Sequence, residues 1–273
     1  MSSGDPREKA VPPFWAGPLS LWCVRLAAAG RSRETIGLRR AHVAQLARGV
    51  GGSPATLTAG ELLAWLAGRE WRRETRRAVR SSLRGFLAHV GRDDLVAELP
   101  FAPAEIPVPR PTPDDVVDAA LAAADDRQLV ILRLASEAGL RRGEISRVHV
   151  DDLSRDLLGW TLLVHGKGGK RRWMPLSDDL ATMVRLWCRG GWLLPGRIDG
   201  HLSARRVGEL ASEVLPGVWT THSLRHRFAT RAHNRTGDLV AVSRLLGHAS
   251  VATTQRYVAT DAARLRAVAA AAA

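Results

Sequence analysis

Six residues whose side chains can act on a phosphodiester occur in short, separate segments of the second half of the chain. They are Arg141, Lys167, His222, Arg225, His248 and Tyr257, and Tyr257 is the only tyrosine in the sequence. Two arginines can clamp the non-bridging oxygens of a phosphorane-like transition state, and a histidine can donate a further hydrogen bond. A lysine can protonate the leaving 5′-oxygen, and a tyrosine can attack the phosphorus. The set therefore predicts phosphoryl transfer without a metal ion.

Each of these segments also has an ordinary structural explanation when it is read alone. Arg141 and Glu144 can form an exposed ion pair, and the glycines around Lys167 can form a basic surface turn. That stretch, HGKGGKRR, does not match the phosphate-binding pattern GxxxxGK[ST]. His222 and Arg225 share one helix face, which can contact nucleic acid without catalysis. The prediction of chemistry therefore depends on the six residues taken together.

Hydrophobic periodicity and turn signals predict that these residues lie on helices and on one β-hairpin. Helices are expected at about 114–123, 127–137, 144–150, 178–188, 203–214, 222–233, 238–246 and 250–258. Thr112 and Ser177 are the expected caps of the first and fourth of these helices. Between 160 and 176 the pattern becomes apolar and partly β-branched, with turn residues at 166–169. This segment predicts a hairpin that projects Lys167 from its turn.

The first part of the chain predicts four short helices and no strand. They are expected at about 19–29, 35–48, 58–65 and 71–90, and the third opens with the capping box Thr58-x-x-Glu61. On the fourth helix an apolar stripe consists of Val79, Leu83, Phe86, Leu87 and Val90. A second stripe consists of Arg73, Arg76, Arg77, Arg80 and Arg84. These arginines form either a solvated face or, with few acidic residues beside them, a face that contacts DNA phosphates.

A proline-rich stretch divides the chain. Residues 100–113 contain six prolines, which favour an extended backbone. A surface loop inside one domain is the alternative, but such a composition is more typical of a linker. We therefore expect a helical DNA-binding domain at 1–100, a linker at 101–113, and a second domain with a C-terminal tail at 114–273. The expected fold class is mainly α-helical, with a small β-hairpin or sheet in the second domain.

Charge and composition limit the class of partner. The 273 residues have a formal net charge of +13, which indicates a polyanion such as nucleic acid or an anionic membrane surface. No apolar run of membrane-spanning length and no secretory signal occur, and the tryptophans do not gather on one amphipathic helix. Two cysteines far apart disfavour a disulfide scaffold. We expect a cytoplasmic protein that binds nucleic acid rather than a membrane.

The order and local sequence of the six residues resemble the tyrosine recombinases, also called lambda-integrase-like proteins or phage integrases. That family orders its catalytic residues as Arg, Lys, His-x-x-Arg, His or Trp, and Tyr. The matching segments are GLRRGE with Arg141, HGKGGKRR with Lys167, HSLRH with His222 and Arg225, LLGH with His248, and TTQRY with Tyr257. Glu144 matches a carboxylate of supporting role, three residues after the first arginine. The resemblance covers the whole chain and indicates a short form without an arm-binding domain.

The resemblance implies a fold, a mechanism and partners. A core-binding domain and a catalytic domain would enclose double-stranded DNA. Tyr257 would attack one strand, leaving a 3′-phosphotyrosyl bond and a free 5′-hydroxyl, and strands would be exchanged through a Holliday junction. The protein would be a monomer when free and a homotetramer on DNA. It would need no metal or nucleotide cofactor, and an accessory directionality factor is a further candidate partner. The expected role is integration or excision of a phage or mobile element.

Three alternatives remain open on the sequence. A Xer-like chromosome or plasmid resolvase would use the same residues on other sites. A type IB topoisomerase would use similar residues to relax supercoils as a monomer. A non-enzymatic DNA-binding protein would retain only the fold. Separately, the Ala-rich end VAAAAA is either a fraying helix or a degradation tag.

Overall fold

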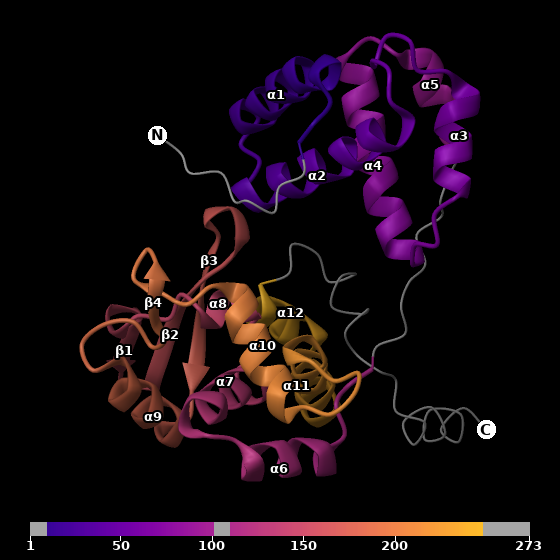
Figure 1. The fold of residues 1–273 in the computed structure, drawn as a ribbon. Helices are drawn as coiled ribbons and strands as arrows, with labels where there is room; N and C mark the ends of the chain where they lie inside the picture. The colour runs from indigo at the N-terminus through magenta and orange to yellow at the C-terminus, as the bar shows by residue number, and fades with distance from the viewer. Residues whose placement is uncertain (1–9, 101–109, 248–273) are drawn as a thin grey trace, which may run out of the picture. The chain divides into compact units, whose positions relative to one another are not determined.

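The computed structural model describes residues 10–100 and 110–247, without the side chains of Lys167 and Ile198. The chain divides into two compact units, Met1–Ala104 and Glu105–Ala273. The predicted fold class is confirmed, because helices dominate both units and the second contains a small antiparallel sheet (Figure 1). Within the described ranges, no helix has the length and apolar character needed to cross a membrane.

The described part of the first unit is a bundle of helices. These are α1 (Pro13–Ala28), α2 (Arg33–Val50), α3 (Ala59–Ala67), α4 (Arg73–His89) and α5 (Asp93–Glu98). The predicted capping box is confirmed: the Thr58 N–H donates to Glu61 Oε2 at 2.9 Å, and the Glu61 N–H donates to Thr58 Oγ1 at 3.2 Å. The first helix begins at Pro13, earlier than predicted, because proline is well tolerated at the first helical position. Helix α5 was not predicted, since six residues are too few for a periodic pattern.

The apolar stripe of α4 forms part of the core of this unit. Val79, Leu83, Phe86 and Leu87 are buried, as predicted. Phe86 stacks on Trp15 with ring centroids 5.8 Å apart, and Trp22 meets its edge at 5.6 Å. Each fully buried side chain of this kind contributes about 1.5–3 kcal/mol of hydrophobic free energy. Burial of this apolar face therefore fixes the orientation of α4, and the arginines lie on the other faces of the helix.

The second unit begins with helices and continues through the sheet to a second group of helices. Its elements are α6 (Asp114–Ala123), α7 (Asp126–Glu137), α8 (Arg142–Ile145), β1 (Leu153–Asp156), β2 (Gly159–His165), β3 (Arg171–Leu176), α9 (Asp178–Cys188), β4 (Pro195–Ile198), α10 (Ala204–Val214), α11 (Thr221–Thr236) and α12 (Leu239–Leu246). Ser177 caps α9 as predicted, accepting the Leu180 N–H at 3.3 Å. Helix α8 ends five residues before the predicted 150, and the helix expected at 250–258 lies outside the described residues.

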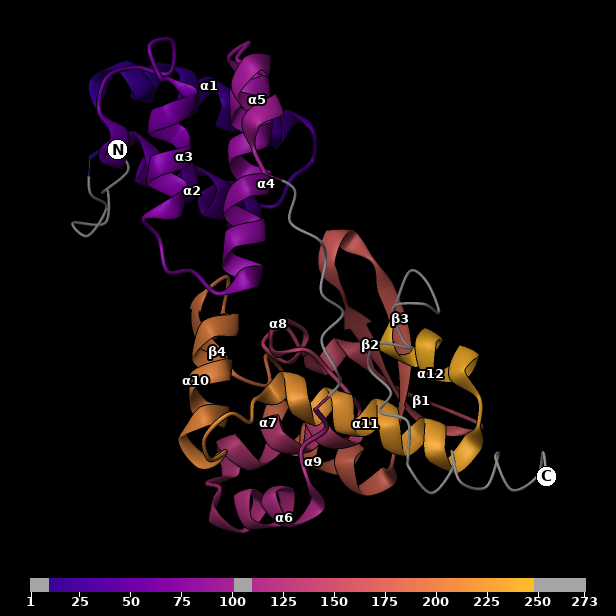
Figure 2. The same cartoon turned by 90° about the vertical axis from the view of Figure 1, so that its right-hand side faces the viewer.

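The sheet has three antiparallel strands in the order β1-β2-β3. Strands β2 and β3 form the predicted hairpin, in a register that pairs Trp160 with Leu176 and Val164 with Arg172. Strand β1 was not predicted, because its sequence, LSRD, lacks an alternating apolar pattern. Helix α12 packs beside β3 (Figure 2) and α9 against β2. Through these contacts the sheet fixes the position of the hairpin turn relative to α9 and α12.

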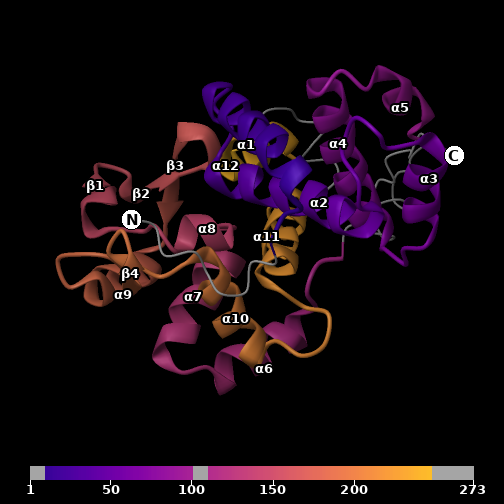
Figure 3. The same ribbon diagram turned by 45° about the horizontal axis from the view of Figure 1, so that its top comes forward.

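Helix α8 lies within the second unit, in contact with α7 and α10 (Figure 3). The predicted cap of α6 is wrong: its N-cap is Pro113, and no side chain caps the helix. Thr112 instead donates its hydroxyl to Ser223 Oγ on α11 at 2.9 Å. A partner more than one hundred positions away in the chain competes successfully with the local cap, because both hydroxyls are buried and need hydrogen bonds.

Two glycines permit close packing around α12: Gly139 lies against α11 and α12, and Gly247 lies against β3. Gly139 has φ +61°, and a Cβ there would lie 2.5 Å from Phe228 Cδ1. Gly247 ends α12 with φ +64°, and a Cβ there would lie 3.0 Å from Arg172 Cδ. Both positions combine a left-handed backbone with little space, so any larger residue would strain the helix ends.

Candidate active site

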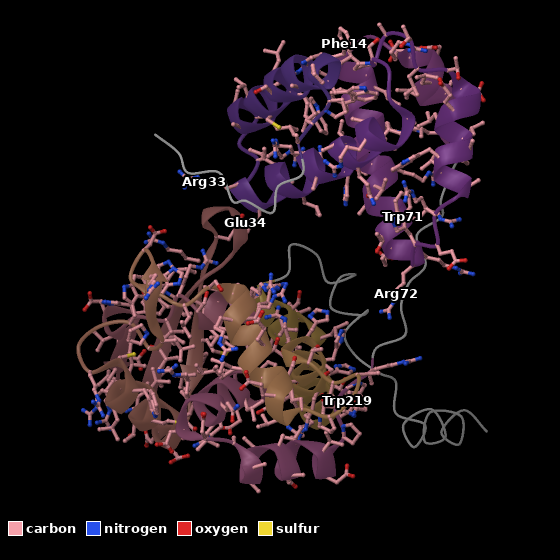
Figure 4. The ribbon with its side chains drawn as sticks, in the orientation of Figure 1. Phe14, Arg33, Glu34, Trp71, Arg72 and Trp219 are labelled. Carbon is pink, nitrogen blue, oxygen red and sulfur yellow. The ribbon has the colours of Figure 1, made fainter. Side chains whose placement is uncertain are left out.

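A cavity of about 680 Å³ opens in the second unit between α8, α10 and the N-terminal end of α11. Its wall includes Arg141, Glu144, Arg147, Arg205, Thr220 and His222. Arg141, Glu144 and His222 are predicted site residues, and the packing of α10 against both α8 and α11 brings them together. Figure 4 labels Trp219, on the loop that leads from α10 into α11.

The start of α11 is well capped. The Thr220 hydroxyl accepts the His222 N–H at 3.2 Å, and Ser223 Oγ accepts the Thr220 N–H at 2.8 Å. Because the backbone N–H groups at a helix N-terminus carry partial positive charge, this end of α11 favours an anion. The cap therefore orients His222 at the cavity wall in a setting suited to a phosphate group.

Glu144 joins arginines that come from three different elements. Its side chain is only 3% exposed. Its carboxylate accepts Arg172 Nη1 at 2.8 Å and Nη2 at 2.9 Å, and accepts the Arg141 N–H at 2.8 Å and Nη1 at 2.9 Å. Arg225 Nη1 lies 3.6 Å from Glu144 Oε2. The carboxylate therefore holds the guanidinium of Arg141 through one charge-assisted hydrogen bond and its backbone through another.

The surrounding arginines decide the protonation state of Glu144. Burial alone would raise the pKa of its carboxyl group. The hydrogen bonds and charge of Arg172, the backbone hydrogen bond from Arg141 and the charge of Arg225 outweigh burial and lower the pKa of Glu144 to about 2. Glu144 is therefore ionised at neutral pH and acts as an anchor for guanidinium groups rather than as a proton donor.

Arg141 and Arg225 occupy different environments, although both were predicted to clamp a phosphate. The Arg141 side chain is 39% exposed and lines the cavity. Arg225 is fully buried, and its Nη1 and Nη2 donate to the carbonyl oxygens of Gly139 and Leu246, each at 2.5 Å. An anion in the cavity can reach Arg141 directly. The contact of Arg225 with phosphate stays a prediction.

His222 is exposed at the cavity and surrounded by positive charge. Its ring meets that of His226 edge-on, with centroids 4.7 Å apart. Partial desolvation, followed by the charges of His226, Arg225 and Arg141, lowers the pKa of His222 to about 4. The ring is therefore neutral at neutral pH and can donate one hydrogen bond to an anion without carrying a charge of its own.

Three of the predicted residues are not placed by the structure. His248 and Tyr257 lie outside the described residues, as does the side chain of Lys167. The backbone of Lys167 opens a 3₁₀ turn, Lys167–Gly169, between β2 and β3. Gly168 continues this turn with φ +73°, which a glycine adopts without strain.

Arg172 is a residue of this network that the sequence pattern predicted only as part of a strand. Its side chain is 10% exposed and bonds to both carboxylate oxygens of Glu144. The alternation of faces along β3 could have identified this residue, because Arg172 falls on the same strand face as Met174 and Leu176, which are buried. A charged residue on an inward-facing position predicts a buried partner of opposite charge.

The five arginines predicted to contact DNA lie on α4 of the first unit. Arg73, Arg76, Arg77 and Arg84 are exposed, and Arg80 is half-buried. Burial, followed by the charges of Arg84 and Arg76, lowers the pKa of Arg80. Arg72 projects outward at the N-terminal end of the same helix (Figure 4). The helix therefore concentrates positive charge at the surface, while its contact with DNA stays a prediction.

Comparison with known proteins gives matches to one family. The model of the phage integrase family matches residues 112–264, more than half of the chain. Tyrosine recombinase XerC from Methylobacterium sp. (strain 4-46) is 35% identical over 217 residues, which cover 68% of this chain and 67% of that protein. Tyrosine recombinase XerD from Caulobacter vibrioides is 34% identical over 209 residues, covering 67% of this chain and 68% of that protein.

Solved structures share the fold. A lambda integrase (75–356) dimer bound to a COC′ core site matches with a TM-score of 0.71 at 19% identity, over 89% of this chain and 94% of that one. XerH site-specific recombinase bound to its difH substrate matches with a TM-score of 0.66 at 18% identity, over 92% and 82%. Similarity at this level of identity concerns the fold alone.

Proposed function

The chain belongs to the phage integrase family and is a tyrosine recombinase, and on that premise we propose that it cuts and rejoins duplex DNA at specific sites through a 3′-phosphotyrosyl intermediate. The observation that carries this proposal is the cavity whose wall includes both Arg141 and His222, with the buried carboxylate of Glu144 holding Arg141 in place. A guanidinium and a neutral imidazole at one wall suit the extra negative charge of a phosphoryl-transfer transition state.

The proposed reaction is a transesterification at phosphorus. The Tyr257 hydroxyl gives up its proton to water as its oxygen forms a bond to the phosphorus, and the bond from the phosphorus to the 5′-oxygen breaks. Lys167 gives its proton to that oxygen, which leaves as a 5′-hydroxyl. Arg141, Arg225, His222 and His248 stabilise the charge on the non-bridging oxygens. The phosphotyrosyl ester keeps the energy of the broken bond, so that a second 5′-hydroxyl can reverse the reaction and join a new strand.

Double-stranded DNA is the proposed partner. The net charge of +13 and the exposed arginines of α4 favour a polyanion. The related lambda integrase has been solved as a tetramer bound to a Holliday junction. We infer that four copies of this chain assemble on two DNA sites, with 1–100 as the core-type DNA-binding domain, 101–113 as a linker and 114–273 as the catalytic domain with its tail.

Two biological roles fit this chemistry. Integration or excision of a phage or mobile element needs two sites of different sequence, whereas Xer-like resolution needs two similar sites in one circle. Identities of 34–35% to XerC and XerD proteins favour the second role. A two-site plasmid assay separates them, because a resolvase excises the segment between direct repeats of one selected site without a second type of site.

Covalent trapping tests the proposal. The Tyr257→Phe variant selects its binding site from a random-sequence DNA pool, and the wild-type protein is incubated with a nicked suicide duplex of that site in the presence of a metal chelator. A detergent-stable adduct with the wild type, and none with Tyr257→Phe, is expected. Binding without any adduct would indicate a non-enzymatic DNA-binding protein. Relaxation of plasmids that lack the site would indicate a type IB topoisomerase.

A further inference from the structure

Arg172 is tied to two segments that each adjoin a predicted catalytic residue. Its Nη1 and Nη2 donate to the two oxygens of Glu144, which in turn accepts two hydrogen bonds from Arg141. Its Nε donates to the carbonyl oxygen of Leu245 at 2.5 Å, near the C-terminal end of α12. One guanidinium thus connects β3, the start of α8 and the end of α12.

The contacts of Arg172 are with protein groups rather than with the cavity. Its side chain is 10% exposed, against 39% for that of Arg141, and it is not part of the wall of the 680 Å³ cavity. The fork of two parallel hydrogen bonds fixes the plane of the Glu144 carboxylate. Because Arg141 Nη1 donates to Glu144 Oε1 and its backbone N–H to Oε2, the orientation of its guanidinium depends on that plane.

The end of α12 is packed against the same guanidinium. A Cβ on Gly247 would come within 3.0 Å of Arg172 Cδ and 3.3 Å of its Nη1. Arg225 donates to the next carbonyl oxygen, that of Leu246. Two arginines therefore hold successive carbonyl groups at the C-terminus of α12, where the helix dipole favours positive charge.

We propose that Arg172 is a positioning residue for DNA strand cleavage. It orients Arg141 through the carboxylate of Glu144, and it holds the C-terminal end of α12 through the carbonyl oxygen of Leu245. Arg172 does not touch the phosphate. The inference depends on the proposed function, since it concerns the rate of the same reaction. Loss of its forked hydrogen bonds should slow cleavage while leaving DNA binding intact, because the arginines of α4 and the overall charge remain.

The test compares Arg172→Gln and Arg172→Lys with a matched control, Arg133→Gln. Arg133 is 16% exposed and bonds to Glu137 at 2.7 Å and Asp179 at 2.6 Å, so its loss also removes two ion pairs from the second unit. It has no bond to Glu144 among its described partners. The measurements are the single-turnover rate of adduct formation on the selected suicide duplex, the Kd for that duplex in a Tyr257→Phe background, and the Tm of each variant.

Arg172→Gln is expected to lower the cleavage rate by an order of magnitude or more, since small displacements of a catalytic group have effects of this size. Its Kd should stay within twofold of that of Arg133→Gln. Arg172→Lys keeps the charge but lacks the fork, so it should restore only a small part of the rate. If Arg172→Gln does not fold, the cleavage rate of Arg172→Lys decides the proposal.

A spectroscopic measurement separates positioning from a loss of stability. A carbon-13 NMR titration of the Glu144 carboxyl should show a higher pKa in Arg172→Gln than in the wild type and no change in Arg133→Gln. Wild-type cleavage rates in both Arg172 variants, or full rescue by lysine, would overturn the proposal while leaving the proposed function in place. If the wild-type protein itself forms no adduct with its bound site, the proposed function fails first and this inference falls with it.

Discussion

The carboxylate of Glu144 receives both Nη groups of Arg172, at 2.8 and 2.9 Å, from a strand 28 positions later in the chain. The same carboxylate accepts the backbone N–H and Nη1 of Arg141. A four-residue helix such as α8 has little stability of its own. Its orientation, and with it the position of Arg141 at the cavity, therefore depends on this buried ion pair.

Replacement of Arg141 by alanine should slow strand cleavage by about 100- to 1,000-fold, as does the loss of a donor to a developing oxyanion in other enzymes. The reason is that Arg141 presents an exposed guanidinium at the cavity wall. The single-turnover rate of adduct formation is the measurement. Arg127→Ala, which removes an exposed arginine from α7, is the control and should cleave at the wild-type rate. Near-normal cleavage by Arg141→Ala would refute its assignment.

Replacement of Glu144 by glutamine should change how the free energy of unfolding depends on acid pH. The pKa of Glu144 is lowered from 4.5 to about 2 in the folded protein, so the unfolded state takes up this proton at a higher pH. The stability that Glu144 contributes is therefore fully present above pH 4.5 and is lost as the pH falls toward 2. Urea unfolding of both proteins across this range should show a difference that shrinks with acidification. A difference independent of pH would contradict the ion-pair network.

His222 should be neutral in the free protein at pH values where an ordinary histidine is half-protonated. Its pKa is lowered from 6.5 to about 4, first by desolvation and then by His226, Arg225 and Arg141. Protonation of the unfolded state thus destabilises the fold as the pH drops below 6.5. Proton NMR of the ring, assigned with a His222→Gln variant, gives the pKa. Adding the selected duplex should raise it, because a nearby phosphate favours the charged ring; an unchanged value on binding would place the phosphate elsewhere.

Replacement of Gly139 by alanine should destabilise the second unit. The added Cβ meets Phe228 Cδ1 at 2.5 Å on a backbone with φ +61°, and both overpacking and this conformation cost about 1–3 kcal/mol. Urea unfolding measures the change. Gly143→Ala is the matched control, since a Cβ there meets only the Cβ of Ala204 at an ordinary 3.6 Å. Equal stabilities of the two variants would argue against the close approach of α11 to Gly139.

Replacement of Arg77 by glutamine should weaken DNA binding and its dependence on salt. An arginine in contact with one phosphate contributes about 0.9 to the slope of log K against log salt concentration. Arg77 is exposed on α4, in the stripe proposed to contact DNA. Titrations of the selected duplex at several salt concentrations give the slope. Arg31→Gln, which removes the same charge from an exposed loop of the same unit, should leave the slope unchanged. Identical slopes for both variants would show that the arginine stripe of α4 is a solvated face that does not contact DNA.

Local patterns explain why much of the fold was predictable from the sequence. The capping box of Thr58 and Glu61 involves residues three apart, and the apolar stripe of α4 follows from helical periodicity. The hairpin of β2 and β3 follows from apolar strands on either side of a glycine-rich turn. The exceptions were three elements too short to show a period, α5, β1 and β4, and the end of α8, which was predicted five residues too late. The start of α6 was the other exception, because Thr112 bonds to Ser223 instead of capping the helix.

The amino-acid sequence was sufficient to predict the residue types of the site and their order, because chemistry constrains which side chains can clamp, protonate and attack a phosphodiester. It also determined the helical character of both units, since periodicity and capping act between near neighbours. The packing of the folded chain was needed to show that Glu144 binds Arg172 as well as Arg141, that Arg141 lines the cavity, and that Arg225 is buried against main-chain carbonyls. The contacts of Glu144 with Arg172 and of Arg225 with the carbonyls join residues from 21 to 86 positions apart, and such contacts depend on how helices and strands pack rather than on any local pattern.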